Sequence, residues 1–439
     1  MFHYIPGKRR PSRLAFPLLA ATGAFVASGV ADAAPPVGGP NRPAEEIATN
    51  PVGDQYLETL LTRAATSHPS IAAARAAVRA SGADVSAARW QAFPSFSVQG
   101  LWLDQRANSR QTSLVIDQPI WTGGRISSSI KRAKAQRLAS IAAYQEAVLQ
   151  VMLDVSQSYR EYHRLNRKYE ILQKSLTEHR NLVQTMERRV QQEVSPQADL
   201  ELARSRTAQV QQQVTMTAAQ RLNALQKLRE LVGDPGLDPG PPPPDAPPVE
   251  LNSDELVART LAFDPTRQRL TSEAEAARAE AASARASILP QLSGQYSYDE
   301  TYGHRVGLVL KAQSSGGLSS FSSASAARLR QEAAELKIAA TERNLRERTI
   351  FDVAEYESAR DRIQSTNIAR GATARVTESY VRQFTSGRRT WLDVMNAVRE
   401  GTSAESDAVD AAASANEARD RLLMRSGSWP FPDDGGDMQ

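Results

Sequence analysis

The chain has 439 residues, with 53 Lys and Arg against 49 Asp and Glu, and it contains no cysteine. The lack of cysteine excludes disulfide bonds, thiolate metal sites and a lipidated N-terminal cysteine. Attachment to a membrane would therefore have to come from the fold itself.

Residues 1–33 have the pattern of a secretory signal peptide. Four basic residues precede a largely apolar stretch, residues 14–30, and the small residues of Ala31-Asp32-Ala33 offer a cleavage site. The alternative is a transmembrane anchor, but this stretch is short of the roughly 20 residues that a spanning helix needs. Cleavage would remove four of the 53 basic residues and one of the 49 acidic residues, which leaves a nearly neutral chain. We therefore expect an exported protein without the basic surface of a nucleic-acid-binding protein.

The rest of the chain is predicted to be duplicated, with a first repeat at residues 50–232 and a second at residues 251–425. Self-similarity at a fixed offset is the signature of a repeated architecture. Three landmarks recur in one order at offsets of 193 to 196 residues: Pro69 and Pro94 as Pro265 and Pro290, Gly123-Gly124 as Gly316-Gly317, and Asp199-Leu200 as Asp393-Val394.

Each repeat is predicted to contain a short helix, two strands, a long helix and a second short helix. The long helices would reach about 100 Å at 1.5 Å per residue, so that two short helices end to end match one long helix. Their content of Ala, Gln, Glu, Arg and Leu is typical of long coiled-coil packing. The predicted helices span residues 55–90, 125–193 and 196–232 in the first repeat, and residues 253–288, 320–385 and 391–425 in the second.

Proline and capping residues predict where the helices stop. Residues 233–250 are Pro-rich and form the predicted linker between the repeats, and residues 426–439 form a predicted irregular tail. At the break before the second short helix of the first repeat, Ser195 is the expected N-cap and Pro196 the first helical residue. At the equivalent break of the second repeat, Thr390 is the expected N-cap.

Between the first short helix and the long helix, each repeat has about 30 residues in which apolar and polar side chains alternate. This period of two, with aromatic residues nearby, is typical of barrel strands with one lipid-facing and one water-facing side. The predicted apolar positions are Phe96, Val98, Gly100, Trp102, Leu114 and Ile116 in the first repeat, and Leu292, Gly294, Tyr296, Tyr298, Val306, Leu308 and Leu310 in the second. The expected aromatic girdle at the membrane surface is Trp102, Trp121, Tyr296 and Tyr298.

Four strands cannot close a barrel, and open sheet edges are not tolerated in lipid. If the strands cross a membrane, several chains must share one barrel, and three chains would supply twelve strands. The predicted fold class is therefore mainly α with β: a long antiparallel α-helical coiled-coil barrel plus a transmembrane β-barrel with four strands per subunit. The alternative is a pair of soluble hairpins on an elongated coiled coil, as in a periplasmic adaptor or scaffold protein without a pore.

Two motifs resemble those of the TolC-like outer-membrane efflux and secretion channels, also called outer membrane factors. The segment Gln118-Pro119-Ile120-Trp121-Thr122-Gly123-Gly124-Arg125 resembles the family's Gln-Pro-Leu-aromatic-x-Gly-Gly-Arg signature. The segment Gly387-Arg388-Arg389-Thr390-Trp391-Leu392-Asp393-Val394-Met395-Asn396-Ala397 resembles the family's second helix-turn. The resemblance covers about residues 50 to 425 and implies a trimer, with a twelve-stranded barrel above an α-helical barrel that crosses the periplasm.

The resemblance also implies roles for single residues. Asp393 takes the place of the first acidic residue of the periplasmic gate, and Asn396 stands where the family often has a second Asp. Arg389 takes the place of the Arg that ties neighbouring helix hairpins together, and Asp199 would be its carboxylate partner. Phe384 stands where a Tyr could offer a hydroxyl to this tie.

The glycines of the first motif have a simpler interpretation as well. Gln118 and Pro119 end a predicted strand, and the Gly123-Gly124 and Gly316-Gly317 pairs lie where a strand passes into a helix, so turn geometry accounts for them. The histidines have no metal-ligand spacing, and no phosphate-binding loop or nucleophile elbow is present in the sequence. We therefore expect neither an enzyme nor a cofactor.

The resemblance implies a passive exit duct in the outer membrane of a Gram-negative bacterium, extending into the periplasm. Its expected partners are two further copies in a homotrimer, outer-membrane lipid, a periplasmic adaptor protein and an inner-membrane pump of the ABC or RND type. Type I protein secretion and efflux of small molecules both fit this sequence.

Overall fold

The computed structural model describes residues 54–102, 110–243, 252–300, 302–312 and 318–430. The predicted signal peptide, Gly316 and Gly317 lie outside the described residues. All described elements belong to one compact unit, Thr49–Gln439.

The same order of elements occurs twice along the chain. The first series is α1 (Gln55–Ser67), α2 (Pro69–Trp90), β1 (Ser95–Trp102), β2 (Arg110–Trp121), α3 (Arg125–Gln191) and α4 (Gln197–Val232). The second is α5 (Ser253–Phe263), α6 (Pro265–Ala286), β3 (Gln291–Asp299), β4 (Gly303–Lys311), α7 (Ser319–Thr385) and α8 (Trp391–Arg425). The predicted class, mainly helical with a small set of strands, is confirmed.

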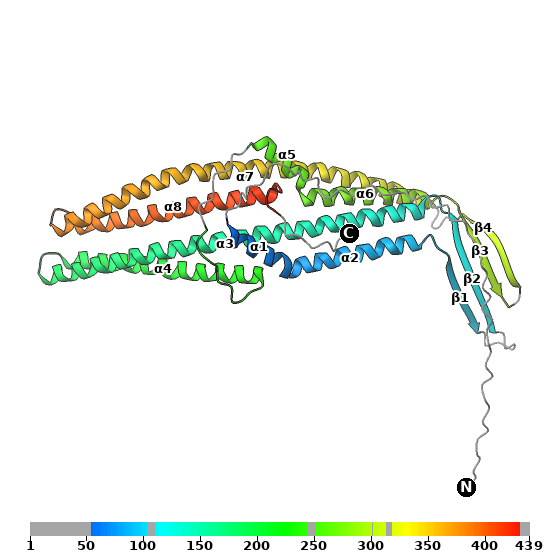
Figure 1. The fold of residues 1–439 in the computed structure, drawn as a ribbon, viewed down its shortest axis with the longest axis horizontal. Helices are drawn as coiled ribbons and strands as arrows, with labels where there is room; N and C mark the ends of the chain where they lie inside the picture. Colours follow the sequence, from blue (N-terminus) through cyan, green and yellow to red (C-terminus); the bar gives the residue numbers. More distant parts are fainter. Residues whose placement is uncertain (1–53, 103–109, 244–251, 301, 313–317, 431–439) are drawn as a thin grey trace, which may run out of the picture. The chain divides into compact units, whose positions relative to one another are not determined.

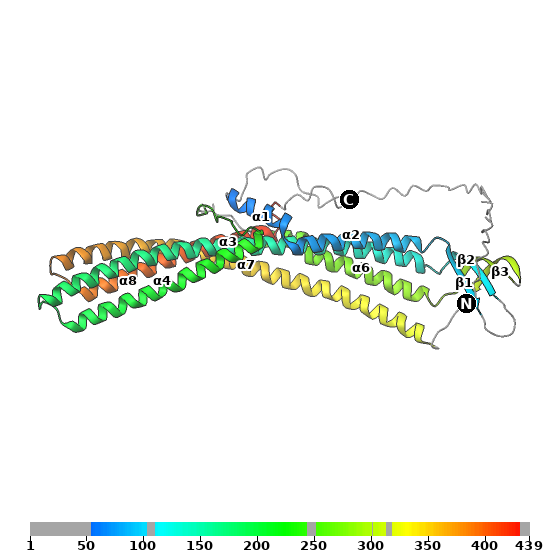
Figure 2. The same ribbon diagram turned by 90° about the horizontal axis from the view of Figure 1, so that it is seen from below.

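Helices α2, α3, α4, α6, α7 and α8 lie side by side in a layer, with the strands at one end and the α3–α4 and α7–α8 turns at the other (Figure 1). In the half next to the strands, neighbouring helices follow the order α2, α3, α6, α7, and in the half next to the turns the order α4, α3, α8, α7. The long helices α3 and α7 run through both halves, as both views show (Figures 1 and 2). None of the described helices combines the length and apolar character needed to cross a membrane.

The first short helix of each series is interrupted, which the prediction of unbroken helices over residues 55–90 and 253–288 did not include. His68 (φ −70°, ψ 127°) separates α1 from α2, and Asp264 (φ −51°, ψ 118°) separates α5 from α6. Both residues precede a proline, whose ring disfavours the helical conformation of the residue before it. Both then cap the next helix: His68 accepts from the Ser70 N–H and Asp264 from the Arg267 N–H.

The four strands form one antiparallel sheet in the order β1-β2-β3-β4. The β2–β3 pairing joins the two series of elements, and a register shift lies between Pro119 and Trp121. Proline fits this place because a bulge does not require its missing N–H.

A buried ion network links the two ends of the described chain at the middle of the helices. The Arg160 guanidinium, 3 % exposed, lies 3.3 Å from Asp54 and 2.8 Å from Asp420. Burial raises the pKa of Asp420, and Arg160 together with a hydrogen bond from Ser156 opposes that shift. Removing one partner would leave an uncompensated buried charge, so this network fixes α3 against α1 and α8.

The described parts of the predicted linker and tail, residues 233–243 and 426–430, are packed more closely than their composition predicts. Leu237 is buried, and His163 of α3 is bonded through Nε2 to the Pro239 carbonyl at 3.2 Å. In the described part of the tail, residues 426–430, Trp429 is 1 % exposed and lies in the central apolar cluster with Leu57, Met152 and other residues of α1 and α3. Both segments therefore contribute to the core.

Candidate functional site

The sheet has one apolar and one polar face. Directly paired residues of antiparallel strands share a face, so the row Phe96, Ile116, Tyr296 and Val306 crosses all four strands on one side. Phe96 is 80 % and Val306 84 % exposed, although both are large apolar side chains. The opposite face carries mainly Ser, Gln and charged side chains, listed as Ser95, Ser97, Gln99, Ser113, Asp117, Ser293, Gln295, Ser297, Asp299, Arg305 and Lys311.

The passage from β2 to α3 is a tight turn that depends on glycine. Gly123 and Gly124 have φ values of +61° and +90°, in the left-handed region. A Cβ on Gly123 would lie 3.0 Å from the Cβ of Leu289, so this turn also packs against the segment before β3. The Gln118 side chain donates to the Ala92 carbonyl at 3.0 Å and thereby fastens the α2–β1 connection to β2.

At the other end of the helices, the α3–α4 and α7–α8 turns have the same backbone. The residues after the last helical residue, Gln192 and Ser386, have φ/ψ of −89°/7° and −88°/7°. The next residues, Glu193 and Gly387, have φ of 56° and 72°. The bond that closes each turn is also equivalent, from Val194 to the Arg189 carbonyl and from Arg388 to the Gln383 carbonyl, both 2.9 Å.

A side-chain bond crosses each turn, but the arginine lies on opposite sides. Arg189 of α3 donates to the Ser195 hydroxyl at 3.1 Å, whereas Arg389 donates to the Gln383 amide oxygen of α7 at 3.2 Å. Ser195 is therefore not the N-cap of α4. That position belongs to Pro196, which has no side-chain acceptor.

Asp393 belongs to a complete capping box at the start of α8. The Asp393 N–H donates to the Thr390 hydroxyl at 3.2 Å, and the Thr390 N–H donates to the Asp393 carboxylate at 3.3 Å. Arg389 lies 3.9 Å from the same carboxylate and 4.3 Å above the Tyr380 ring. Thr390 is therefore the N-cap, as predicted.

The two hairpins meet in an apolar cluster next to their turns, which we call the tip cluster. Its buried members come from α3, α4 and α8, and Phe384 of α7 packs against them. The Arg189 guanidinium lies 5.5 Å from the centre of the Phe384 ring, within the range of a cation–π contact. The buried members are Met186, Leu200, Ala203, Trp391 and Met395.

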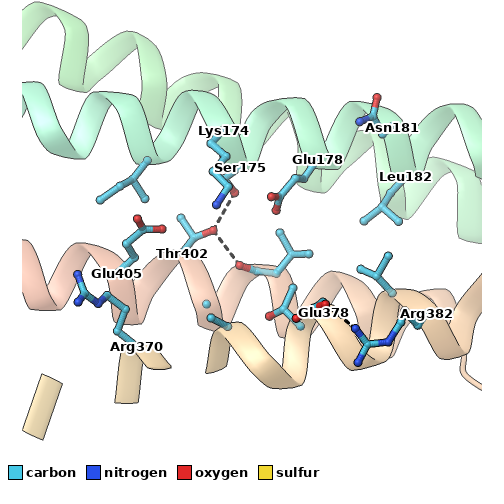
Figure 3. Close-up of a pocket in the computed structure, with 16 residues that line it drawn as sticks. Lys174, Ser175, Glu178, Asn181, Leu182, Arg370, Glu378, Arg382, Thr402 and Glu405 are labelled. Carbon is cyan, nitrogen blue, oxygen red and sulfur yellow. Dashed lines mark hydrogen bonds and ion pairs between the residues drawn. The ribbon is translucent and has the colours of Figure 1, made fainter. Parts of the chain in front are cut away.

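Beyond the tip cluster, a groove of about 500 Å³ separates α3 from α7, with α8 at its floor. In Figure 3 the Ser175 and Thr402 hydroxyls meet across it, and their oxygens are 2.9 Å apart. Acidic and basic side chains alternate along its rim, among them Lys174, Glu178 and Glu378. The groove thus has no strong charge of one sign.

Comparisons with known proteins agree with this geometry. Residues 60–234 match the family described as outer membrane efflux protein. This segment of the chain resembles outer membrane efflux proteins. Members of this family, and the solved structures that the chain resembles, are outer-membrane channels and not enzymes. A search of curated proteins finds no match to the sequence.

Solved structures of outer-membrane channels have the same fold as this chain. CusC is 16 % identical, with a TM-score of 0.73 over 85 % of this chain and 92 % of that chain. VceC of Vibrio cholerae is 17 % identical, with a TM-score of 0.72 over 86 % and 97 %. The Neisseria gonorrhoeae MtrE channel in its open state is 17 % identical, with a TM-score of 0.72 over 87 % and 91 %.

The predicted girdle residues lie at different heights of the sheet. Trp121 is half-exposed at the helical end and pairs with Leu292, whereas Tyr298 is six residues further along β3, about 20 Å at the rise of a strand. Tyr296 lies between them. The side chain of Trp102, the last residue of β1, lies outside the described part.

Sequence reasoning missed two exposed aromatic residues at the helical end of the sheet. Trp90 and Phe93 are 67 % and 55 % exposed, and their ring centres are 4.8 Å apart. The last turn of α2 contains Trp90, and Phe93 follows just before β1. Their spacing of three residues before a proline was visible in the sequence, but only the structure places them beside the sheet.

The structure brings some of the predicted gate residues together and keeps others apart. Arg389 and Asp393 are neighbours within one turn, and Asn396 is exposed one turn further along α8. Asp199 lies in the first turn of α4. Among the ion pairs of the described residues, Arg389 is joined to Asp393 and not to Asp199.

Proposed function

We propose that this chain is one subunit of a passive trimeric channel in the outer membrane. The four strands would join those of two further copies in a twelve-stranded barrel, and the helices would continue the conduit into the periplasm. The family match and the fold support a channel, and the likeness over more than four fifths of the chain favours it over the periplasmic adaptor alternative.

The exposed apolar face of the sheet is the observation that carries this proposal. Large apolar side chains with 80 % or more of their surface exposed are costly in water but favourable in contact with lipid tails. The described sheet has two open edges, at β1 and β4, and open edges cannot stand in lipid. Pairing β4 of one copy with β1 of the next would satisfy both conditions at once.

Helix α7 also supports an assembly. It is as long as α3, 67 residues, but it lies at the margin of the helical layer, and several of its large apolar side chains are exposed. Phe351 and Ile368 are each 66 % exposed. A neighbouring subunit packed along α7 would remove this apolar surface from water.

We place the gate at the two helical turns. Asp393, with Asn396 one turn away, would face the constriction, and Arg389, Asp199 and Phe384 would tie hairpins of the same or neighbouring subunits. Adaptor docking would open this end, and an inner-membrane ABC or RND-type pump would supply the energy for protein secretion or small-molecule efflux. Each subunit would contribute its two turns to the gate, and three subunits together would close it.

A pair of neighbouring substitutions tests the membrane sheet. Val98 is 68 % exposed on the apolar face, and Gln99, the next residue, is on the polar face. An Arg on a lipid-facing strand costs about 2–4 kcal/mol near the middle of the bilayer, whereas a lumen-facing Arg does not meet lipid. We expect Val98→Arg to abolish the heat-sensitive trimer in outer-membrane fractions and Gln99→Arg to retain it.

The matched variant makes the result specific for the face and not for the charge. Equal tolerance of both substitutions, with the protein still in the outer-membrane fraction, would contradict the lipid contact of this face. If the trimer is lost in both variants, the sheet tolerates no added charge on either face. Two further single variants then separate a folding defect from a defect in lipid contact: Val98→Leu, which keeps the face apolar, and Val306→Arg, which places a charge elsewhere on it.

A further inference from the structure

Four charged side chains that the structure describes on the strands lie on the polar face of the sheet. Asp117, Asp299, Arg305 and Lys311 occupy alternate positions that share this face with Ser and Gln residues. Two are acidic and two are basic. If this face lines the pore, the charges of these four side chains sum to zero there.

Asp117 and Lys311 form a pair at the helical end of the sheet. The Lys311 ammonium lies 3.2 Å from Asp117 Oδ2, and the Ser293 hydroxyl donates to the same oxygen at 3.1 Å. Asp117 pairs with the first residue of β1, Ser95, and Lys311 is the last residue of β4. The pair therefore connects β2 to β4 across β3, at the level where the strands pass into the helices.

The second pair lies at the opposite end of β4. Arg305 is bonded to Asp299 through its Nη2, and its guanidinium lies 4.9 Å from the centre of the Tyr302 ring. Lys311 and Arg305, one at each end of β4, are thus each in contact with an acid, Asp117 of β2 and Asp299 of β3. The field of two opposite charges in contact falls off much faster than that of a single charge.

We propose that Asp117 and Lys311 are selectivity-determining residues, and that their pairing makes the sheet part of the conduit indifferent to the sign of a permeating ion. This inference rests on the proposed function, because it requires the polar face to line a pore. The side chain of Lys311 is 57 % and that of Asp117 25 % exposed, so both are accessible to ions in such a pore. Any ion preference of the whole channel would then arise at the helical turns.

The test is the reversal potential of the full-length channel in planar bilayers under a KCl gradient. Lys311→Gln leaves three unpaired carboxylates in a trimer and should shift the permeability ratio towards K⁺. Asp117→Asn leaves three ammonium groups and should shift it towards Cl⁻. With the charges about 10 Å from the pore axis in 0.1 M salt, each shift is on the order of threefold, and it grows as the salt is lowered.

Two further variants decide whether the pairing itself is responsible. The double variant Asp117→Asn/Lys311→Gln should return the ratio to the wild-type value, and Lys311→Arg should leave it unchanged. Conducting single variants with wild-type selectivity would overturn the inference, as would a double variant that keeps the shift of one single variant. If one single variant does not assemble, the opposite shift of the other carries the test.

Failure of the inference can be told apart from failure of the proposed function. A wild-type chain that forms no conducting trimer would contradict the channel itself. A conducting wild-type channel with unresponsive selectivity would contradict only the role of Asp117 and Lys311.

Discussion

The α3–α4 and α7–α8 turns have the same backbone conformation, but the side chains that cap and pack them differ. At equivalent positions, Glu193 corresponds to Gly387, Pro196 to Thr390 and Gln197 to Trp391. The arginine of the cross-turn bond is on α3 in one turn and directly before α8 in the other. Equal chain geometry is therefore compatible with unequal chemistry.

This difference indicates which of the two turns is held in place by its own side chains. The α7–α8 turn has a glycine at the left-handed position, a capping box and a Trp inside the tip cluster. The α3–α4 turn has Glu193 at the left-handed position and Pro196 as its N-cap, without a side-chain acceptor. The second turn is thus fixed by its own residues, whereas Asp199 in the first keeps a carboxylate that the capping of α4 does not use.

The largest expected effect is at the first residue of each helix after its turn. Trp391→Ala removes a buried aromatic side chain from the tip cluster and should destabilise it by about 3–5 kcal/mol. Gln197→Ala, at the equivalent exposed position, should change stability by less than about 0.5 kcal/mol. Hydrogen exchange of the amides near both turns measures the two losses. Similar protection in the two variants would mean that the turns are energetically equivalent.

An intermediate effect is expected at the residues proposed to close the gate. Asp199→Ala or Arg389→Ala should loosen the closed end of the channel. Loss of a charge-assisted hydrogen bond worth about 1.5 kcal/mol would raise the fraction of open channels about tenfold. Single-channel conductance and antibiotic permeation measure this change. Arg388→Ala is the matched control, because it removes an adjacent arginine outside the proposed tie. Unchanged conductance and permeation in both variants would contradict the proposed role of Asp199 and Arg389 in closing the gate.

The smallest effect is expected at the left-handed positions. Glu193→Gly should stabilise the first turn by about 0.5–1 kcal/mol, since an L-residue at φ 56° carries a steric cost that glycine lacks. Gly387→Ala should destabilise the second turn by about 1 kcal/mol, although an added Cβ meets no described atom within 4 Å. Hydrogen exchange at residues 190–195 and 384–389 should move in opposite directions. A change of the same sign at both turns would refute their backbone equivalence.

The long helices and the strands were predictable from the sequence. Helical composition, alternation in the strands and the Gly-Gly turn are local signals, and they place α3, α7 and the four strands within a few residues. The breaks at His68 and Asp264 were also visible, because both precede proline. The Ser195 assignment was wrong because Ser195 lies one residue too early and serves Arg189 instead.

Contacts between distant segments could not be predicted in this way. The burial of Trp429 depends on α1 and α3, and the Arg189–Phe384 contact depends on how α7 approaches α3. The sequence identified Phe384 only as a residue without a hydroxyl. Its place against the tip cluster gives it an apolar role between the hairpins, which no local pattern encodes.

The most direct test of the channel is the state of the chain in the outer-membrane fraction of expressing cells. Our account predicts a species of three copies in an unheated gel and in native mass spectrometry, which becomes a monomer on heating and conducts ions in a planar bilayer. A monomer recovered wholly from the periplasm, without conductance, would contradict it.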